Sequence, residues 1–593
     1  MKELTLRAAI VGLALAMVMG AANIYLGLKV GMTVSASIPA AVLAMLILRG
    51  VFSNGTILEA NQIQTTASAG ESLAAGIIFT MPALLLIGAW QHFDMVMTTV
   101  IAFTGGLLGV LFMIPMRRVF VVKTSSDLKF PEAVACATVL EAGNQTGTEA
   151  HNVIWGALIG MAFKILITFF GVIKGIFEVA VQGLGGRLFY FGSDISPALV
   201  AVGYIVRFNI ASLIFIGGAL SWIVGIPLFG FHSSGGDYLS EVWTLWGTQV
   251  RYVGVGAMVV GGVTSIFKVR HGLLQVIHEI SNRHLNPNGS TTPNNQDRDI
   301  SSKAIGVLSC TVVLLIGAVY YVLTGDTLIS LTTTITMILM AFFFTAVSSY
   351  IVGLVGNSNS PVSGMTITTV LFTGGLLLLF GFSGMEGMVA TLGVAAIVCC
   401  AACTAGDVCN DLKTGSLVGA SPFRQQTMQV LGIAVASLVM APVLQLLHNN
   451  TPGGIGGREL SAPQATLFKG LVEGLFGQGD LPWLMVTIGM GVGIVILAID
   501  KLLESQRSSF RMHIMPVAVG MYLPLGLSTP ILIGGFLSYI TYHGKKKISS
   551  QRLDRGILYA SGLIAGESLG GIALAFLASR GIGPFGTNIS GSL

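Results

Sequence analysis

Long apolar runs separated by short polar stretches dominate the chain. Each run is close to the roughly 20 residues that cross a hydrocarbon core as an α-helix, and we count about 16 such spans, some short or broken. Alternating segments of about ten residues, which would favour a membrane β-barrel, do not occur. The clearest runs are Ala8–Leu28, Ser72–Trp90, Val153–Ile173, Ile210–Phe229, Ala304–Leu323, Thr333–Val355, Met365–Phe382 and Leu481–Ile499.

The composition agrees with this pattern. Of the 593 residues, 53% are hydrophobic and only 10% are charged, whereas an ordinary soluble domain is about 25% charged. The 77 glycines are typical of membrane helices, whose backbones pack closely through small residues. The sequence therefore predicts an all-α polytopic membrane protein of about 16 transmembrane helices with internal pseudo-symmetric repeats.

One polar stretch, rich in Asn and Pro, divides the chain nearly in half. It lies at Ser281–Lys303 and lacks apolar periodicity, which indicates a flexible loop. We expect an N-terminal membrane half at residues 1–270, a cytoplasmic polar loop at 271–303 and a C-terminal membrane half at 304–593.

The basic residues are concentrated in four loops. These loops hold 17 of the 31 Lys and Arg residues, and basic loops stay on the cytoplasmic side of a membrane. We therefore expect a multi-pass protein whose N-terminus and four basic loops face the cytoplasm. The loops are Arg117–Lys129, Lys268–Lys303, Lys501–Arg511 and Lys545–Arg555.

The sequence also repeats itself. The pentapeptide Ala-Gly-Glu-Ser-Leu occurs near both ends of the chain, each time with its acid about 45 residues after a tyrosine. Two weaker copies lie between them. The four tyrosines are Tyr25, Tyr204, Tyr350 and Tyr522, and the residues at the acid position are Glu71, Ala257, Asp407 and Glu567.

Three of the copies have a Gly- or Pro-interrupted segment after the tyrosine. Interrupted helices at matching places of a repeat indicate the central site of a transporter, so we expect these segments to line a cavity. Ordinary turns between spans are the alternative. The segments are Tyr25–Pro39, Tyr350–Pro361 and Tyr522–Pro530.

Taken together and in order, several motifs resemble the oligopeptide transporter (OPT) family over nearly the whole chain. The resemblance is closest to bacterial members, nearer the yellow-stripe-like branch than the fungal peptide branch. It implies a bacterial inner-membrane protein and secondary active uptake, generally driven by protons, of small peptides, glutathione-like thiols or metal chelates. The motifs are NQIQTTASAGESLAAGIIFTMPALLLIG, LKFPEAVACATVLEAG, SPALVAVGYIV, RYVGVGAMVVGG, AGDVCNDLKTGSLVGASPFRQQ and ASGLIAGESLGGI.

Three acids in apolar segments are candidates for proton coupling: Glu71, Glu567 and Asp407. A carboxylate inside a membrane helix is costly and usually faces a cavity. A desolvated carboxyl group can take up and release a proton near neutral pH. Small neighbours such as Gly70 and Ser72 let another backbone approach. The alternative is that these acids bind the free N–H groups at the start of a helix.

Amides and tyrosines near the interruptions are the candidate substrate ligands. An amide both donates and accepts hydrogen bonds, as a peptide backbone requires, whereas a polar interfacial loop or a plain turn is the alternative. We expect Asp411 and Lys413 to form a cytoplasmic loop or a gate pair. The candidates for substrate binding are Tyr25, Asn61, Gln62, Gln64, Asn357, Asn359 and Tyr522.

Signatures of other function classes are absent from the sequence. It has no P-loop, no His-Glu-x-x-His and no convincing nucleophile elbow, and its nine histidines lack metal-ligand spacing. We therefore expect no enzyme activity, no cofactor, no protein-bound metal and no nucleic-acid partner. The predicted function is proton-coupled symport, into the cytoplasm, of small peptides or of peptide-like, metal-chelated substrates. The alternative is an uncoupled channel or facilitator for small polar solutes.

Overall fold

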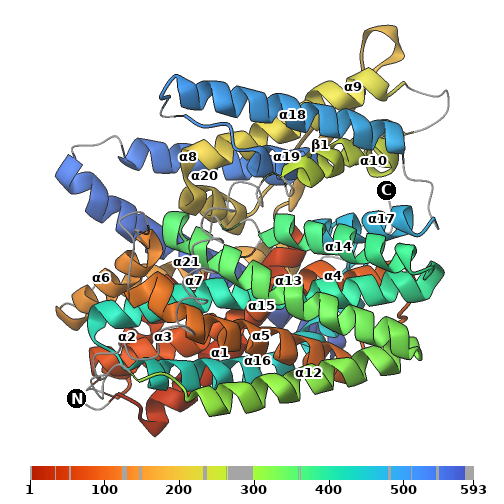
Figure 1. Cartoon of the computed structure of the whole chain (residues 1–593). Helices are drawn as coiled ribbons and strands as arrows, with labels where there is room; N and C mark the ends of the chain where they lie inside the picture. The colour runs from red at the N-terminus through yellow and green to blue at the C-terminus, as the bar shows by residue number, and fades with distance from the viewer. Residues whose placement is uncertain are drawn as a thin grey trace. The chain divides into compact units, whose positions relative to one another are not determined.

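Figure 1 shows the computed structural model of the chain. It describes residues 3–580 and 582, except 32, 34, 53–54, 123–127, 129, 146–149, 232–236, 262–263, 265–297, 358–359, 361, 478–481, 509 and 543–545. Within this part of the chain, 13 helices are long and apolar enough to cross a membrane. This confirms the predicted all-α polytopic membrane protein. A shorter apolar helix, Ser37–Gly50, also lies in this part of the chain.

The chain forms two compact units, and each unit combines a segment from both halves of the sequence. Unit 1 contains Met1–His151 and Ser265–Gly479, and unit 2 contains Asn152–Thr264 and Asp480–Leu593. The helices of unit 1 are α1 (Leu6–Val30), α2 (Ser37–Gly50), α3 (Ile57–Glu71), α4 (Leu73–Leu86), α5 (Met95–Arg117), η1 (Arg118–Val122), α6 (Pro131–Gln145), α12 (Ser302–Thr324), α13 (Thr327–Val355), α14 (Val362–Leu379), α15 (Gly384–Val418), α16 (Pro422–Asn450) and α17 (Pro463–Leu475).

Unit 2 combines the middle and the last part of the chain. Its elements are α7 (Ala150–Thr168), β1 (Ile176–Gln182), η2 (Leu184–Gly186), β2 (Leu188–Asp194), α8 (Pro197–Ala219), η3 (Leu220–Gly225), α9 (Ile226–Phe229), α10 (Tyr238–Leu245), η4 (Trp246–Val250), α18 (Trp483–Ser505), α19 (Ile514–Tyr522), α20 (Leu525–Tyr542) and α21 (Lys546–Ser579). Each unit therefore contains residues from both halves of the sequence. The predicted division at residues 270 and 304 rests on the polar stretch between the halves and stays a prediction.

In unit 1, α2 is a half-length helix that returns the chain to the end where α1 began. Arg7 near the start of α1 pairs with Glu59 near the start of α3 at 2.7 Å, so α1 and α3 start at the same end. Arg7 also lies over the ring of Phe52, which follows α2. Ala36, just before α2, donates to Glu71 of α3, which also accepts from Asn23 of α1. These two residues lie about 18–24 Å further along their helices at 1.5 Å per residue.

Charged residues gather at this same end of unit 1. Arg424, at the start of α16, donates to Glu3 at 2.8 Å. Arg117, buried at the end of α5, makes a bidentate ion pair with Asp299 at 2.6 and 3.1 Å. The N-terminus, the end of α5 and the residues before α12 therefore share one end. We call it the ionic end, and it consists of Glu3, Arg7, Glu59, Arg117, Asp299 and Arg424.

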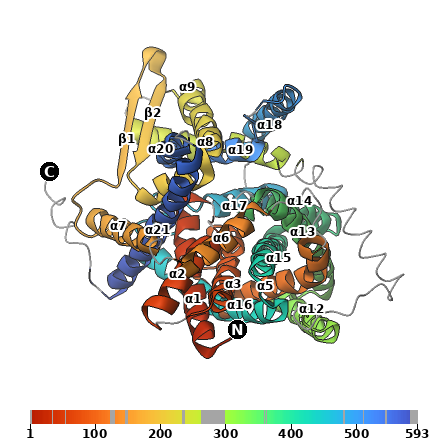
Figure 2. The same cartoon turned by 90° about the vertical axis from the view of Figure 1, so that its left-hand side faces the viewer.

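Unit 2 contains a β-hairpin that the sequence did not predict. Strands β1 and β2 are antiparallel, with Val179 opposite Phe191, and lie beside α20 (Figure 2). Leu188 and Tyr190 on one face of β2 pack against a buried cluster that includes Trp222. The hairpin is an addition to the helical architecture and lies between α7 and α8 in the chain.

Two helices of unit 2, α7 and α21, touch through their backbones. Gly156 and Gly160 of α7 face Gly562 and Gly566 of α21, and a Cβ at any of the four would overlap backbone atoms of the other helix. Such Gly-x-x-x-Gly pairs allow the closest approach of membrane helices. The glycine that precedes Glu567 is therefore required by helix packing.

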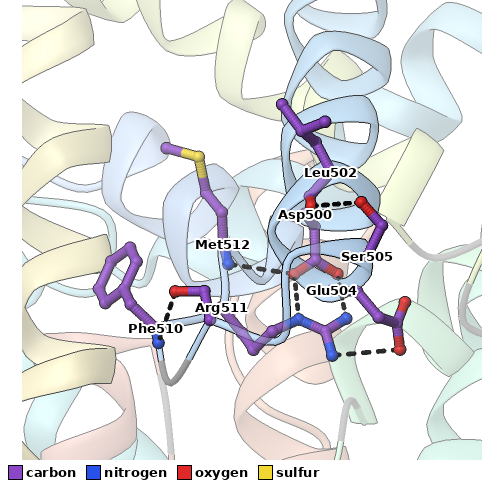
Figure 3. A network of polar contacts seen from close by, with 8 residues as sticks. Asp500, Leu502, Glu504, Ser505, Phe510, Arg511 and Met512 are labelled. Carbon is purple, nitrogen blue, oxygen red and sulfur yellow. Dashed lines mark hydrogen bonds and ion pairs between the residues drawn. The ribbon is translucent and has the colours of Figure 1, made fainter.

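A network of ionic contacts connects α18 to the segment just before α19 (Figure 3). Asp500, almost fully buried near the end of α18, accepts from Arg511 Nε at 2.9 Å and Nη2 at 3.1 Å, and from the backbone N–H of Met512 at 3.1 Å. Arg511 also reaches Glu504 at 3.2 Å. The hydrogen bonds to Asp500 raise the pKa of Arg511 above its ordinary value. The last residue of the basic loop Lys501–Arg511 is thus fixed in place.

Candidate functional site: a buried carboxyl cluster in unit 1

Each of the four repeat tyrosines is followed by a break in its helix. The breaks lie between α1 and α2, between α13 and α14, and between α19 and α20, which confirms the three predicted interruptions. The fourth is a kink at Arg207 inside α8, where φ is 68°. All four copies of the repeat therefore place irregular backbone shortly after the tyrosine. No described contact tests whether these breaks line a cavity.

Glu71, at the end of α3, binds the first of these breaks. Its carboxyl group is 3% exposed and accepts hydrogen bonds from the side-chain amide of Asn23 and from the backbone N–H of Ala36, the latter at 3.3 Å. Ala36 immediately precedes α2, so its N–H is one of those left without a partner inside the helix. Glu71 thus caps a neighbouring helix at the point where that helix begins inside the bundle.

Asp407 and Asp411 of α15 lie one helical turn apart and belong to the same buried network. Asp407 accepts from Asn357 Nδ2 at 2.5 Å, in the break between α13 and α14. Asp411 accepts from Gln64 Nε2 of α3 at 2.5 Å. The acids at the repeat position in the first and third copies, Glu71 and Asp407, therefore each hold the break of their own copy.

Two serines join the aspartates to each other. Ser68 of α3 donates to Asp407 Oδ1 at 3.4 Å, and Ser37 of α2 donates to Asp411 Oδ1 at 3.1 Å. The two hydroxyl oxygens are 3.0 Å apart. Both serines are almost fully buried. Hydrogen bonds between these side chains thus connect α2, α3 and α15.

Helix α3 packs closely against α1 and α16 next to Glu71. A Cβ on Gly70 would lie 2.6 Å from Ala16 Cβ of α1 and 3.0 Å from Ala436 Cβ of α16. Gly70 is therefore the point where α3 passes between two neighbours, next to the acid. The prediction that small residues around Glu71 let other helices approach is confirmed.

Glu567 in unit 2 has a corresponding environment. It is 2% exposed and accepts from Ser196 Oγ at 2.8 and 2.9 Å and from the backbone N–H of Ala198 at 2.9 Å, at the start of α8. Both repeat glutamates therefore cap the first turn of another helix in their own unit. The alternative that these acids stand at the start of their own helices is wrong, because Glu71 is the last residue of α3 and Glu567 lies inside α21.

The predicted substrate-binding residues lie in different parts of the structure. Gln64 and Asn357 touch the aspartates, and buried Asn61 donates to Gln64 at 3.2 Å. Gln62 donates to Glu3 at 3.1 Å and so belongs to the ionic end.

The remaining substrate-binding candidates are two tyrosines and Asn359. Tyr25 is buried on α1, and Tyr522 is buried at the end of α19 in unit 2. Asn359 lies outside the described residues. The geometry therefore joins Asn61, Gln64 and Asn357 to the carboxyl cluster.

The predicted loop position of Asp411 and Lys413 is wrong. Both residues lie inside α15, which continues to Val418. Residues two positions apart on a helix do not face each other, and Lys413 donates to the carbonyl oxygen of Val121 at 3.3 Å, away from the contacts of Asp411. Asp411 is a member of the carboxyl cluster, and its role as a gate stays a prediction.

Sequence reasoning missed Asn23, Ser37 and Ser68. A helical period would have found Ser68, because it lies four residues after Gln64 and three before Glu71 on one face of α3. The four-residue spacing of Asp407 and Asp411 similarly indicates a shared face. Ser37 had no such local signal, since its position depends on where the chain resumes after a break. In the described part of the chain, no group of three or more His, Cys, Asp or Glu is arranged to hold a metal ion.

Comparisons with known proteins agree with this architecture. A profile of the family described as "OPT oligopeptide transporter protein" matches residues 3–578. A relative from Haemophilus influenzae, provisionally named an oligopeptide transporter, is 33% identical over 595 residues, covering 94% of this chain and 93% of the relative. The metal-nicotianamine transporter YSL3 of Arabidopsis thaliana is 23% identical, covering 82% of this chain and 74% of its own length. The chain therefore belongs to the OPT oligopeptide transporter family and is a multi-pass membrane transport protein.

Proposed function

We propose that the protein is a proton-coupled symporter that carries small peptides, or peptide-like and metal-chelated compounds, into the cytoplasm. The observation that supports this proposal is the meeting of three buried carboxyl groups, Glu71, Asp407 and Asp411, within unit 1. None of the three has an ion-pair partner among the described residues. Several unpaired negative charges buried together are very costly, so the cluster is suited to holding protons for part of a transport cycle.

The surroundings of the cluster favour a peptide-like substrate. Asn61, Gln64 and Asn357 supply amides that both donate and accept hydrogen bonds, the combination that a peptide backbone presents. The side-chain oxygen of Asn61 is buried and has no hydrogen-bond partner, which leaves it available as an acceptor. The printed names of the two relatives, which concern oligopeptides and metal–nicotianamine, point to the same chemical range.

The proposed orientation places the ionic end in the cytoplasm of a bacterial cell, with the protein in the inner membrane. Arg117 begins one predicted cytoplasmic loop, and Asp299 lies within another. Arg117 and Asp299 form an ion pair, and Gln426, two residues after the Glu3 partner Arg424, also donates to Asp299. These contacts support a shared side for the two loops and the N-terminus. Basic residues favour the cytoplasmic side, which supports this direction.

Uptake into liposomes containing the purified full-length protein tests the proposal. The probes are trialanine, glutathione and nickel–nicotianamine, each with and without an inwardly directed proton gradient. We expect at least one probe to accumulate only with the gradient. Glu71→Gln keeps the size and hydrogen-bonding atoms but cannot titrate, so it is expected to weaken accumulation more than probe-induced thermal stabilisation.

The matched control is Glu504→Gln, which removes an exposed acid in unit 2. It is expected to leave accumulation unchanged. Uptake of these probes that does not respond to the gradient would contradict symport and favour the uncoupled facilitator.

A further inference from the structure

Four oxygen atoms form a continuous chain between the two aspartates of the cluster. They are Asp407 Oδ1, Ser68 Oγ, Ser37 Oγ and Asp411 Oδ1, with successive separations of 3.4, 3.0 and 3.1 Å. All four residues are less than 5% exposed. Each separation is within reach of a hydrogen bond, the first being the longest.

If all three contacts are hydrogen bonds, the chain needs one proton more than the two hydroxyl groups supply. Three hydrogen bonds need three hydrogens, whereas two serine hydroxyls supply two. The amides of Asn357 and Gln64 donate to the outer oxygens and add nothing to the three inner bonds. All three inner bonds exist together only when one aspartate is protonated.

We propose that Ser68 and Ser37 form a proton relay between Asp407 and Asp411. In one state the proton is on Asp407, which donates to Ser68, while Ser68 donates to Ser37 and Ser37 to Asp411. When Asp407 passes its proton to Ser68, Ser68 passes its own to Ser37, and Ser37 passes its own to Asp411. Both serines are neutral before and after, and one proton has moved from Asp407 to Asp411.

Asp411 has a second carboxyl oxygen that is not part of the relay. Its second oxygen, Oδ2, is buried and has no hydrogen-bond partner. A buried acceptor without a donor is costly, so this oxygen is suited to receive a proton or a donor group from outside the chain. The proton can therefore leave Asp411 on the side away from Ser37.

Other titratable groups in the described part of the chain lie near the relay, and Cys403 and Cys409 share α15 with its aspartates. Glu71 on α3 binds Ala36, next to Ser37. On α6, Cys136 donates to the backbone oxygen of Ser37 at 3.6 Å, and Glu132 lies against Gly356 beside Asn357. Lys413 on α15 is directed to Val121 and the ring of Phe130.

The half-length helix α2 contributes Ser37, the residue whose movement would break the relay. Ser37 is its first residue, and Ala36 just before it is held by Glu71. If α2 moves, Ser37 leaves both Ser68 and Asp411, and the relay is interrupted at two bonds. Substrate-driven movement of this break would then determine when a proton can cross between the aspartates.

The test compares serine variants in the same liposomes and with the same three probes, since the relay rests on the proposed proton coupling. Ser37→Ala and Ser68→Ala are each expected to lower gradient-driven uptake about tenfold or more, while counterflow of the probe, which needs no net proton movement, is retained. The double variant should lose no more than a single one, because either change breaks the same relay. Ser72→Ala is the control, because this buried serine bonds Ala69 and Thr404 outside the relay.

Infrared spectra of the purified protein without substrate give an independent readout. At neutral pH, Asp407→Asn and Asp411→Asn should each weaken the band of a protonated carboxyl group, because an amide at either end donates the missing hydrogen. The relay is overturned if only one of these variants weakens the band, or if the two serine effects multiply in the double variant. Loss of gradient dependence in the wild-type protein would instead overturn the proposed function, and the infrared result would still decide on the shared proton.

Discussion

Removing the guanidinium group of Arg511 is expected to destabilise unit 2 substantially. Arg511 makes two charge-assisted hydrogen bonds to buried Asp500, and such bonds contribute about 1.5–3 kcal/mol each. The sum of about 3–6 kcal/mol has to be reduced because 30% of the Arg511 side chain is exposed and solvent screens the pair. For Arg511→Gln we therefore expect a loss of about 2–4 kcal/mol.

Two further variants separate the geometry from the charge. Arg511→Lys keeps the charge but cannot form the two-pronged contact, so we expect about half the loss. Glu504→Gln removes the outer contact, whose carboxylate side chain is 63% exposed, and should cost less than about 1 kcal/mol. The expected order of destabilisation is Arg511→Gln, then Arg511→Lys, then Glu504→Gln.

The assay is thermal unfolding of the full-length protein in detergent, followed by tryptophan fluorescence. Trp222, Trp243 and Trp246 pack against each other in unit 2, so their signal reports on this unit. A loss of 2–4 kcal/mol corresponds to a fall in apparent melting temperature on the order of 5–10 °C for a unit of this size. An unchanged melting temperature for Arg511→Gln, or an equal fall for Glu504→Gln, would refute the reasoning.

Three other predictions concern the repeat, helix packing and topology. Glu567→Gln keeps an acceptor for the N–H of Ala198 and should cost about 1 kcal/mol, whereas Glu567→Ala should cost about 2–4 kcal/mol in the same assay; equal effects would exclude the capping role. Gly566→Ala should destabilise by about 1–3 kcal/mol because α7 and α21 must separate, whereas Gly491→Ala, where a Cβ meets nothing within 4 Å, should be neutral. A cysteine replacing Asn294, which lies outside the described residues, should react in intact cells only with membrane-permeant reagents; reaction with an impermeant reagent would reverse the proposed orientation.

The sequence predicted the features that have a local signal. A carboxylate in an apolar segment is rare, so Glu71, Asp407 and Glu567 stood out, and all three prove to be buried. Helix breaks could also be predicted, because Gly and Pro change the backbone conformation at their own positions in the sequence. The spacing of the repeats then located the break after Tyr522 and the others.

The sequence did not show which distant residues meet. Asp411 and Gln64 are 347 positions apart, and no periodicity within one segment reports such a contact. The direction of α2 was equally hidden, since 14 apolar residues resemble a short span as much as a half-length return. Asp411 was therefore placed in a loop, although its burial and partners make it a member of the cluster.

The half-length helix α2 would also respond to membrane voltage in any transport step that changes its tilt. The N-terminus of a helix is equivalent to about half an elementary positive charge, and that of α2 lies well inside the bundle. One elementary charge that crosses the whole membrane changes in energy by about 2.3 kcal/mol per 100 mV, so half a charge moved through half the thickness changes by about 0.6 kcal/mol. A step in which α2 tilts from the membrane normal into the membrane plane would remove this separation of half charges, so its equilibrium would shift about 2.5–3-fold per 100 mV even when neither proton nor substrate moves in that step.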